Sequence, residues 1–269
     1  MPLRIVSLNA WGGRLYGPLM RFLADADPDV LCLQEVVRTE GAQAEWLTYR
    51  DQGLELAQRA NLFEEIYEAL TGHEAIFCPV AAGDLFDGDI KVPSQFGLAT
   101  FVRKSLPVIG QAQDFVHGDF AAKGWGEHPR ARNAHCVRLF DPDHGSALTV
   151  AHMHGLRDLA GKADTSEREQ QAKALARLIG RIARASERLI VCGDFNVLPG
   201  SSTFEILGGL GLSDLVVSQG YTDTRTSYYD KPTRFADYML VTPNVDVLEF
   251  TVVDEPEVSD HRALMLEIG

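Results

Sequence analysis

Short apolar segments rich in β-branched residues recur along the whole chain. Their length of roughly four to nine residues and their composition predict β-strands. Several contain too few polar positions to have a solvent-exposed face, which is typical of strands buried on both sides. The predicted strands are Leu3–Leu8, Val30–Leu33, Ala75–Val80, Gly97–Val102, Ala134–Phe140, Ala147–Met153, Leu189–Cys192, Tyr238–Val241, Val245–Val253 and Ala263–Ile268.

A second pattern, with apolar residues three or four positions apart, predicts amphipathic helices between some of these strands. The clearest is Ser166–Ala185, which has Thr165 or its own first residue placed to cap the first turn. The other two predicted helices are Arg14–Ala26 and Asn61–Leu70.

The order of these elements bears on the fold class. Strands dominate the later half and helices fall irregularly, so the regular βαβ alternation of a Rossmann fold fits poorly. Two packed sheets with helices outside fit better. No linker or internal repeat divides residues 1–269, which we expect to form one domain. Segments without a periodic pattern are expected to be loops or insertions: Thr39–Arg59, Ala81–Pro93 and Gly118–Pro129.

The charge of the chain restricts its partners. The 269 residues include 45% hydrophobic residues, as in ordinary globular proteins. The 38 acidic and 25 basic residues give a formal net charge of -13, which disfavours an extended contact with a nucleic-acid backbone. A cluster of carboxylates can nevertheless hold a cation, and the cation reverses the local sign of the charge. The composition therefore does not exclude phosphate chemistry.

The cysteines and the absence of long apolar segments indicate in which cellular compartment the protein is expected. Cys32, Cys78, Cys136 and Cys192 are widely spaced and show no metal-ligand pattern, which predicts buried reduced thiols. The N-terminal sequence has no signal-peptide pattern, and no stretch approaches the roughly 20 apolar residues of a membrane helix. We expect a cytoplasmic protein without membrane association or an obligate protein partner.

Polar residues able to bind metal or phosphate stand where several of the predicted strands begin or end. Ligands often gather at such edges, because the sheet is rigid and the adjoining loops are free to vary. These residues are Asn9, Gln34, Glu35, His152, His154, Asp194, Asn196, Asp237, Asp260 and His261.

Five short motifs contain most of these residues. In chain order they are SLN at Ser7–Asn9, LQE at Leu33–Glu35, GDFN at Gly193–Asn196, DYMLV at Asp237–Val241 and SDH at Ser259–His261. In this order and at these strand ends the sequence resembles the endonuclease/exonuclease/phosphatase superfamily, which includes deoxyribonuclease I, exonuclease III-type enzymes and inositol polyphosphate phosphatases. Each motif alone is weak, whereas all five in order over nearly the whole chain form a strong signal.

The resemblance implies a fold and a metal site. The expected fold is a four-layer α/β/β/α sandwich of the deoxyribonuclease I type, in which two mixed sheets pack together with helices outside. By resemblance, Glu35 is the main metal ligand, and Asn9 and Asp260 lie near the same cation. Such an oxygen-rich site suits Mg²⁺ or Mn²⁺.

The resemblance also implies catalytic roles. Asp194 would orient or deprotonate the attacking water, and Asn196 would hold that water or a phosphate oxygen. His261 would contact the phosphate or transfer a proton, with Asp237 fixing its tautomer. The metal would offset the negative charge that develops on the phosphoryl group.

Two histidines and one arginine are further candidates. His152 and His154 are two positions apart on a strand, so they share a face. We align His154 with the family histidine and favour it as the proton donor to the leaving group. His152 stands where the family usually has asparagine and is either a substrate contact or a buried, hydrogen-bonded residue. Arg130 precedes a strand and could grip a phosphate, although a solvated side chain is the commoner role.

These expectations together predict a metal-dependent phosphoesterase that attacks a phosphodiester or phosphomonoester with an activated water. The substrate would be a small molecule or single-stranded nucleic acid. One alternative is an endonuclease or exonuclease acting on DNA or RNA. A second is a binding module that keeps the fold without turnover. The joint presence of the six motif residues favours the enzyme: Glu35, Asp194, Asn196, Asp237, Asp260 and His261.

Overall fold

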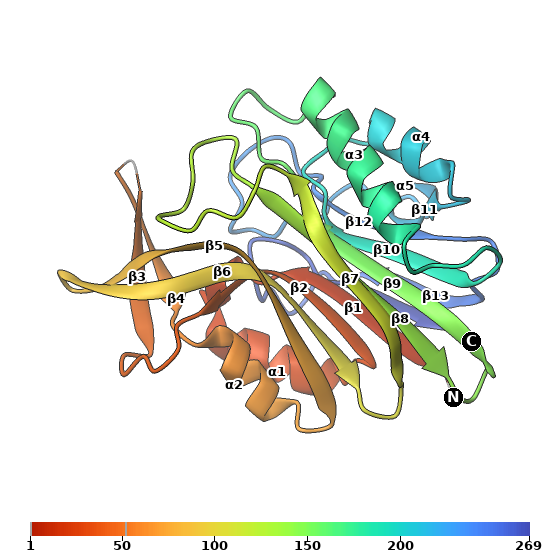
Figure 1. Ribbon diagram of the computed structural model, residues 1–269, viewed down its shortest axis with the longest axis horizontal. Helices are drawn as coiled ribbons and strands as arrows, with labels where there is room; N and C mark the ends of the chain where they lie inside the picture. Colours follow the sequence, from red (N-terminus) through yellow and green to blue (C-terminus); the bar gives the residue numbers. More distant parts are fainter. Residues whose placement is uncertain (1, 52) are drawn as a thin grey trace.

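The computed structural model describes residues 2–51 and 53–269, and two mixed β-sheets packed face to face form its centre (Figure 1). The larger sheet has the strand order β13-β14-β1-β2-β6-β5-β3-β4, with β1 and β2 parallel. Its strands are β1 (Leu3–Asn9), β2 (Val30–Arg38), β3 (Trp46–Asp51), β4 (Leu54–Arg59), β5 (His73–Asp87), β6 (Ile90–Arg103), β13 (Val247–Val252) and β14 (Leu264–Ile268).

The smaller sheet has the order β11-β12-β10-β9-β8-β7. Here β9 and β10 are parallel and the other neighbours are antiparallel. Its strands are β7 (Val108–His117), β8 (Arg132–Asp141), β9 (Ser146–His154), β10 (Arg188–Asp194), β11 (Ser213–Asp214) and β12 (Asp237–Val241).

Helices cover the outer face of each sheet, so the described chain has four layers (Figure 1). Helices α1 (Tyr16–Ala26) and α2 (Leu62–Ala69) lie on the larger sheet, where Leu19, Leu23 and Ile66 are fully buried. The smaller sheet carries α3 (Ser166–Ile179), α4 (Ser202–Gly208) and the short α5 (Leu215–Ser218). The hydroxyl of Thr165 caps α3 by accepting the Arg168 N–H. A short 3₁₀ turn, η1 (Trp11–Gly13), follows β1. The four-layer fold expected from the sequence is confirmed.

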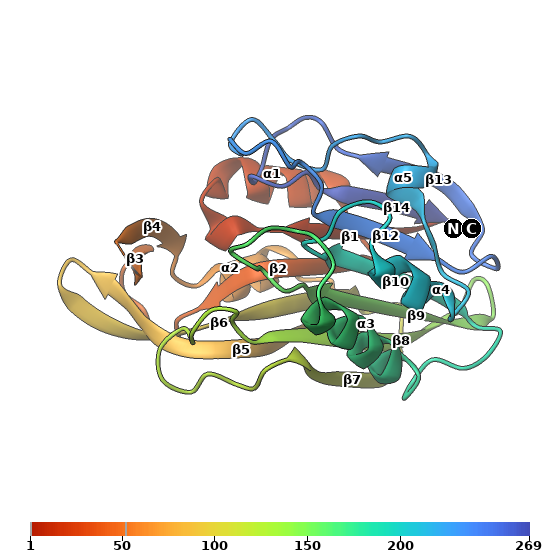
Figure 2. The same cartoon turned by 90° about the horizontal axis from the view of Figure 1, so that it is seen from above.

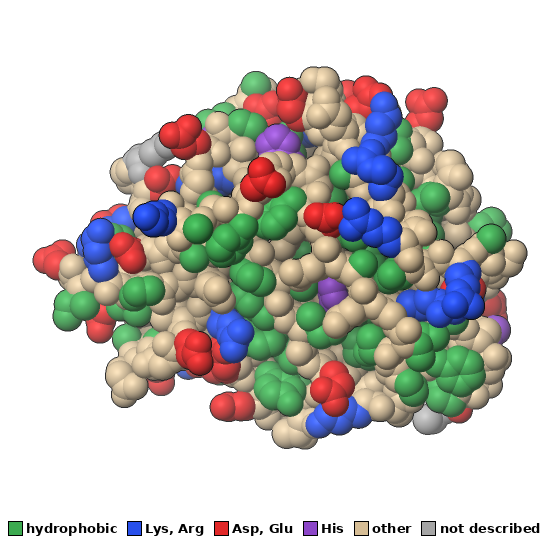
Figure 3. Space-filling view, in the orientation of Figure 1, with side chains coloured by type: hydrophobic (Ala, Val, Ile, Leu, Met, Phe, Trp, Pro, Cys, Tyr) green, Lys and Arg blue, Asp and Glu red, His purple; other side chains and the backbone are tan. Residues whose placement is uncertain are grey.

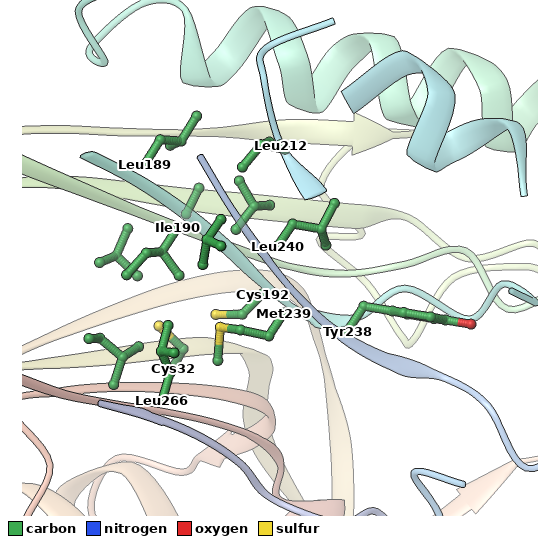
Figure 4. Packing of buried hydrophobic residues seen from close by; sticks show 14 of the residues in the cluster. Cys32, Leu189, Ile190, Cys192, Leu212, Tyr238, Met239, Leu240 and Leu266 are labelled. Atoms are coloured by element: carbon green, nitrogen blue, oxygen red, sulfur yellow. The ribbon is translucent and has the colours of Figure 1, made fainter. Parts of the chain in front are cut away.

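The layer between the sheets is apolar, which explains the strands without a polar face. Figure 4 shows Cys32, Cys192 and Met239 with their side chains close together between the sheets. The four cysteines are free and buried, as predicted. Burial raises the pKa of the Cys78 and Cys136 thiols to about 12, so these thiols stay protonated.

Each predicted strand and helix overlaps an observed one, whereas two of the segments expected to be loops or insertions contain strands, so the loop prediction is wrong for both. Within Thr39–Arg59, β3 (Trp46–Asp51) pairs with β4 (Leu54–Arg59), and Ala81–Pro93 lies within the long β5–β6 hairpin. Both hairpins extend beyond the helices, so their strands keep many partly exposed polar positions and lack a buried-strand pattern. β7 was not predicted because most of its positions are exposed or partly exposed and give no buried-strand pattern. The elements α4, β11 and α5 are too short to show a periodic pattern. Gly118–Pro129 contains no named strand or helix, as expected.

The parallel strand pairs determine where the motif residues meet. β1 and β2 end together in the larger sheet, and β9 and β10 end together in the smaller one. Figure 2 shows both termini at one end of the molecule and β3 and β4 at the other. Among the described residues, no helix is both long and apolar enough to cross a bilayer.

Candidate active site

Asp194 is the last residue of β10 in the smaller sheet, and it lies next to Asn9, the last residue of β1 in the larger sheet. Its Oδ2 atom accepts a hydrogen bond from Nδ2 of Asn9 at 3.1 Å, and its Oδ1 accepts the Asn196 N–H at 3.0 Å. The same Oδ2 lies 3.7 Å from Nε2 of His154 and 3.7 Å from Nε2 of His261. Asp194 is therefore a buried carboxylate held in a fixed orientation, with a histidine ring nitrogen on either side.

His261 is held by Asp237. Its Nδ1 lies 2.9 and 2.8 Å from the two Asp237 carboxylate oxygens. The hydroxyl of Thr224 in turn accepts the backbone N–H of Asp237. Burial, reinforced by the charge of Arg225, lowers the pKa of His261 to about 4. The ring is therefore neutral near pH 7, with Nδ1–H donated to Asp237 and Nε2 left as the lone-pair nitrogen.

Arg225 is a site residue that the sequence analysis missed. Its Nη1 ion-pairs with Oδ2 of Asp260 at 2.8 Å and also donates to Nε2 of His261. The side chain is 6% exposed, and its backbone forms an isolated bridge with that of His261. Arg225 lies in the loop before β12, which shows no periodic pattern, so only the three-dimensional structure reveals its position.

Glu35 occupies a strained position on β2. Its φ is +56°, a left-handed conformation that is unfavourable for a residue with a side chain. The pairing of β2 with β6 shifts register between Leu33 and Val36, so a bulge turns Glu35 out of the regular alternation. Burial and then the neighbouring Asp260 carboxylate raise its pKa to about 7. Such strain persists where the surrounding structure holds the side chain for a purpose.

The predicted metal ligands, Glu35, Asn9 and Asp260, are not the acidic and histidine residues whose ligand atoms lie closest together. Glu35 and Asp260 are close enough to repel each other, and Asn9 lies between Glu35 and Asp194 as a hydrogen-bond donor to both. Among the described residues, the acidic and histidine group with ligand atoms within 4.8 Å of one another is Asp194, Asp237 and His261. In that group, however, Asp237 and His261 already hydrogen-bond each other.

His154, at the end of β9, lies in the cleft. Its Nε2 is 3.7 Å from Oε1 of Glu35, and the side chain is 9% exposed. Burial, followed by the nearby charge of Arg132, holds its pKa well below the usual range. A neutral imidazole there can donate or accept one hydrogen bond through Nε2.

His152 shares the face of His154 but lies one step deeper between the sheets. It is 1% exposed, and its Nε2 and Nδ1 lie 2.8 Å from the Thr100 hydroxyl and 3.3 Å from Nε2 of Gln34. Both ring nitrogens thus have partners inside the protein. Of the two roles considered for His152, the placement favours the buried, hydrogen-bonded residue.

Arg130 lies on the wall of a cavity of about 290 Å³ that opens beside Glu35 and His154. Its Nη2 is 2.5 Å from Oδ2 of Asp51, so its charge is largely offset. Arg132 lies closer to the acidic residues, and its Nε donates to the Gly155 carbonyl. Burial lowers the pKa of Arg132 to about 10, opposed by the charges of Glu35 and Asp194, and the side chain remains cationic near pH 7.

Asn196 and Lys162 complete the cleft. Asn196 has φ +53°, which asparagine tolerates better than most residues, and its Nδ2 donates to the Gly155 carbonyl at 3.4 Å. Lys162 Nζ donates to the Phe235 carbonyl. Burial lowers the pKa of Lys162, and the charges of Asp194 and Asp237 oppose this. Lys162 thus lies near the Asp194 and Asp237 carboxylates.

Gly193 allows β10 to approach β9 just before Asp194. Its φ is +127°, and an added Cβ would lie 2.2 Å from the Met153 carbonyl oxygen. We expect Gly193→Ala to lower the free energy of unfolding by roughly 2–4 kcal/mol, because the two strands must separate. Gly72→Ala is the control, since its Cβ would meet nothing within 4 Å. Equal denaturant midpoints for the two variants would contradict this account of Gly193.

Comparison with known proteins assigns this site to a family. A family model of the endonuclease/exonuclease/phosphatase family matches residues 6–261. The chain belongs to this family. Its members are phosphoester hydrolases. Each of the five motifs that carried the resemblance contributes at least one residue to this cleft.

Individual relatives differ in what they act on. The chain is 25% identical over 223 residues to the inositol phosphosphingolipids phospholipase C of Schizosaccharomyces pombe, covering 78% of this chain and 45% of that protein. The chain thus spans about half the length of this curated relative.

Solved structures show the same fold. The human Nocturnin catalytic domain with bound sulfate has a TM-score of 0.70 and 18% identity, covering 100% of this chain and 94% of that one. The mannosyl-6-phosphatase of Bacteroides thetaiotaomicron has a TM-score of 0.69 and 16% identity, covering 99% of both chains.

Proposed function

We propose that the protein is a divalent-metal-dependent phosphoesterase that hydrolyses a phosphodiester or phosphomonoester by attack of an activated water. The observation that carries this proposal is the position of Asp194, with His154 and His261 each 3.7 Å from its Oδ2. Glu35 and Asp260 lie on the same cleft. A hydrogen-bonded carboxylate beside neutral imidazoles is suited to accept a proton from water.

The residues present fit a cation. The Asp260 and Asp194 carboxylates both lie close enough to Glu35 to repel its charge, and a bound cation would relieve that repulsion. Glu35 and Asp260 would hold the metal, with Asn9 alongside. Their oxygen donors suit Mg²⁺ or Mn²⁺ rather than a thiol-preferring metal. When bound, the cation would stabilise negative charge on the phosphoryl oxygens and the leaving group.

The chain's own residues divide the remaining work. Asp194 takes the proton from the attacking water, and Asn196 positions that water or a phosphoryl oxygen. Arg225 provides hydrogen bonds to the phosphate. His261, neutral and oriented by Asp237, presents its Nε2 lone pair beside Arg225 as a proton acceptor in the cleft. His154 contacts the leaving-group side through Nε2, where we propose that it passes the proton that Asp194 takes from the water, 3.7 Å away, to the departing oxygen.

Asp237→Asn should lower kcat by roughly 10–100-fold while KM changes little, because an asparagine side chain can hold the His261 ring in the wrong tautomer. Steady-state kinetics on a chromogenic phosphodiester measures this effect. Asp25→Asn, on the exposed side of α1, is the matched control. A normal kcat for Asp237→Asn would remove the orienting role from Asp237.

The charge of the protein bears on the substrate class that we propose. On the face shown in Figure 3, basic side chains occur in small groups among acidic and apolar ones. With a formal net charge of -13, this surface favours a small or single-stranded substrate over a DNA or RNA duplex. The buried free thiols fit the cytoplasmic location that we propose.

A substrate panel tests the proposal. We expect bis(p-nitrophenyl) phosphate, p-nitrophenyl phosphate or both to be cleaved with Mg²⁺ or Mn²⁺, and a short single-stranded oligonucleotide to be cleaved more slowly. Faster cleavage of the oligonucleotide would instead indicate a nuclease. Failure of folded, metal-loaded protein to cleave any of the three would favour a binding module that keeps the fold without turnover.

A further inference from the structure

The cavity beside Glu35 and His154 is built by segments far apart in the sequence. The β3–β4 hairpin contributes Tyr49 and Leu56, the β5–β6 hairpin contributes Leu85 and Phe96, and the loop between β7 and β8 contributes Trp125. Figure 1 shows both hairpins at the end of the molecule that extends beyond the helices, and both contribute to the cavity lining. It touches the cleft directly, because Glu35 and His154 belong to its lining.

Aromatic rings form one part of its wall. The Trp125 ring centroid is 5.8 Å from that of Tyr49 and 6.5 Å from that of Phe96. The indole packs against Gly83, where an added Cβ would lie 2.8 Å from the ring. Gly83 therefore makes room for Trp125 in this position. Tilted aromatic rings around a cavity offer faces and edges on which a flat ring can stack.

His128 and Arg130 give part of the cavity lining a polar character. The Arg130 guanidinium lies over the Tyr49 ring, 5.8 Å from its centroid, so polar and aromatic groups adjoin in the wall. The lining therefore suits a ligand that has both an aromatic ring and some polarity.

Two arginines line the cavity where it adjoins the cleft. Arg132 and Arg157 line it beside Glu35 and His154, whereas Arg130 is paired with Asp51. These two arginines give a locally cationic edge to a protein of formal net charge -13. An anionic group at that edge would leave its organic substituent inside the aromatic wall.

We propose that this cavity binds a planar aromatic group esterified to the reacting phosphate, either a nucleobase carried on a sugar or a plain aryl ring. The inference rests on the proposed phosphoesterase function and adds the substrate class. A volume of about 290 Å³ is near the lower end of ligand pockets, which run from roughly 300 to 1,000 Å³, and suits one ring system better than two lipid chains.

Calorimetric binding with Mg²⁺ tests the proposal without requiring turnover. Phenylphosphonate is compared with methylphosphonate and butylphosphonate, whose P–C bonds resist hydrolysis. Uridine 5′-monophosphate is compared with ribose 5-phosphate in the Asp194→Asn variant, so that neither is consumed. We expect the aromatic member to bind at least about tenfold more tightly in one or both series, as ring stacking typically provides. A gain confined to one series identifies the aromatic source.

Variants separate the cavity from the cleft. Trp125→Ala should abolish the aromatic gain, and so should Ala121→Leu, which fills the cavity from its lining without removing an aromatic residue. Trp46→Ala is the matched control, because Trp46 is 38% exposed and lies outside the cavity lining. Loss of the gain in both cavity variants, with the control unchanged, supports the proposal.

The proposal would be overturned if the aromatic ligand bound no more tightly than the aliphatic ones in both series. It would also be overturned if butylphosphonate bound as tightly as phenylphosphonate while uridine 5′-monophosphate bound no more tightly than ribose 5-phosphate. Hydrolysis of bis(p-nitrophenyl) phosphate is measured on the same wild-type preparation. Turnover without an aromatic gain would leave the proposed function standing and reject the aromatic cavity. An aromatic gain that depends on Trp125, in a protein without turnover, would support the cavity and reject the proposed function.

Discussion

Replacing Asp194 with asparagine should lower kcat on a phosphodiester by about 10²–10⁴-fold. The amide keeps the shape of the side chain and can still accept the Asn196 N–H at the position of Oδ1. It cannot take a proton from water, and it would present a donor or a weaker acceptor to Asn9 and the two histidines. The expected loss is therefore mainly in turnover, with the fold retained.

Steady-state kinetics and a thermal melt of the same samples check this prediction. Asp25→Asn is the matched control, because it removes the same charge from an exposed position on α1. A loss of activity shared by both variants would indicate a general electrostatic effect. Turnover by Asp194→Asn within about twofold of wild type would show that another group activates the water.

The second large effect is expected at Glu35. Glu35→Gln should weaken Mg²⁺ or Mn²⁺ binding by at least about tenfold, because the bulge that turns Glu35 toward Asp260 and Asp194 would then present a neutral amide. Activity at low metal concentration should fall sharply and recover in part when excess metal is added. Loss of one carboxylate also relieves repulsion, so the variant should fold at least as stably as wild type.

Calorimetry of metal binding separates this role from a purely catalytic one. Glu68→Gln on α2 is the control, because it changes an exposed carboxylate of the same kind. Normal metal affinity in Glu35→Gln would show that the cation is held elsewhere. In that case Asp194, Asp237 and His261, whose ligand atoms lie within 4.8 Å of one another, would become the candidate metal ligands.

Much of the fold was predictable because buried strands carry a local signal. An apolar run such as Leu189–Cys192 needs both faces covered, and this requirement alone indicates a sheet between two layers. The outer part of the β5–β6 hairpin, Ala81–Pro93, carries no such signal, since it is a projecting ribbon with one open face. Its strands are fixed by their pairing with each other, which periodicity along one strand does not reveal.

The site was predictable to the extent that motifs stand at strand ends. Asp194 and His154 meet because β9 and β10 are parallel neighbours, a register that places these two residues side by side. Arg225 was missed, because its loop is brought to His261 by an isolated bridge rather than by a predicted strand. The strain at Glu35 likewise depends on a bulge in the pairing of β2 with β6.

The two histidines of β9 show what the alternation of side chains along a strand cannot predict. Alternation along the strand correctly puts His152 and His154 on one face. It does not say how deep each residue lies, and depth decides that only His154 reaches the cleft while His152 is enclosed by Thr100 and Gln34. A substrate contact by His152 stays a prediction. Unchanged kcat and KM in a His152→Gln variant would contradict it.

The central claim is that this cleft hydrolyses a phosphoester with a divalent cation and a water activated at Asp194. The most direct test is to strip the protein with chelator and follow hydrolysis of bis(p-nitrophenyl) phosphate and p-nitrophenyl phosphate as Mg²⁺ or Mn²⁺ is added back, with Asp194→Asn in parallel. The account predicts hydrolysis that is absent in chelator, saturates with metal and is lost in the variant. Hydrolysis that persists in chelator or in Asp194→Asn, or no hydrolysis by folded and metal-saturated wild type, would contradict it.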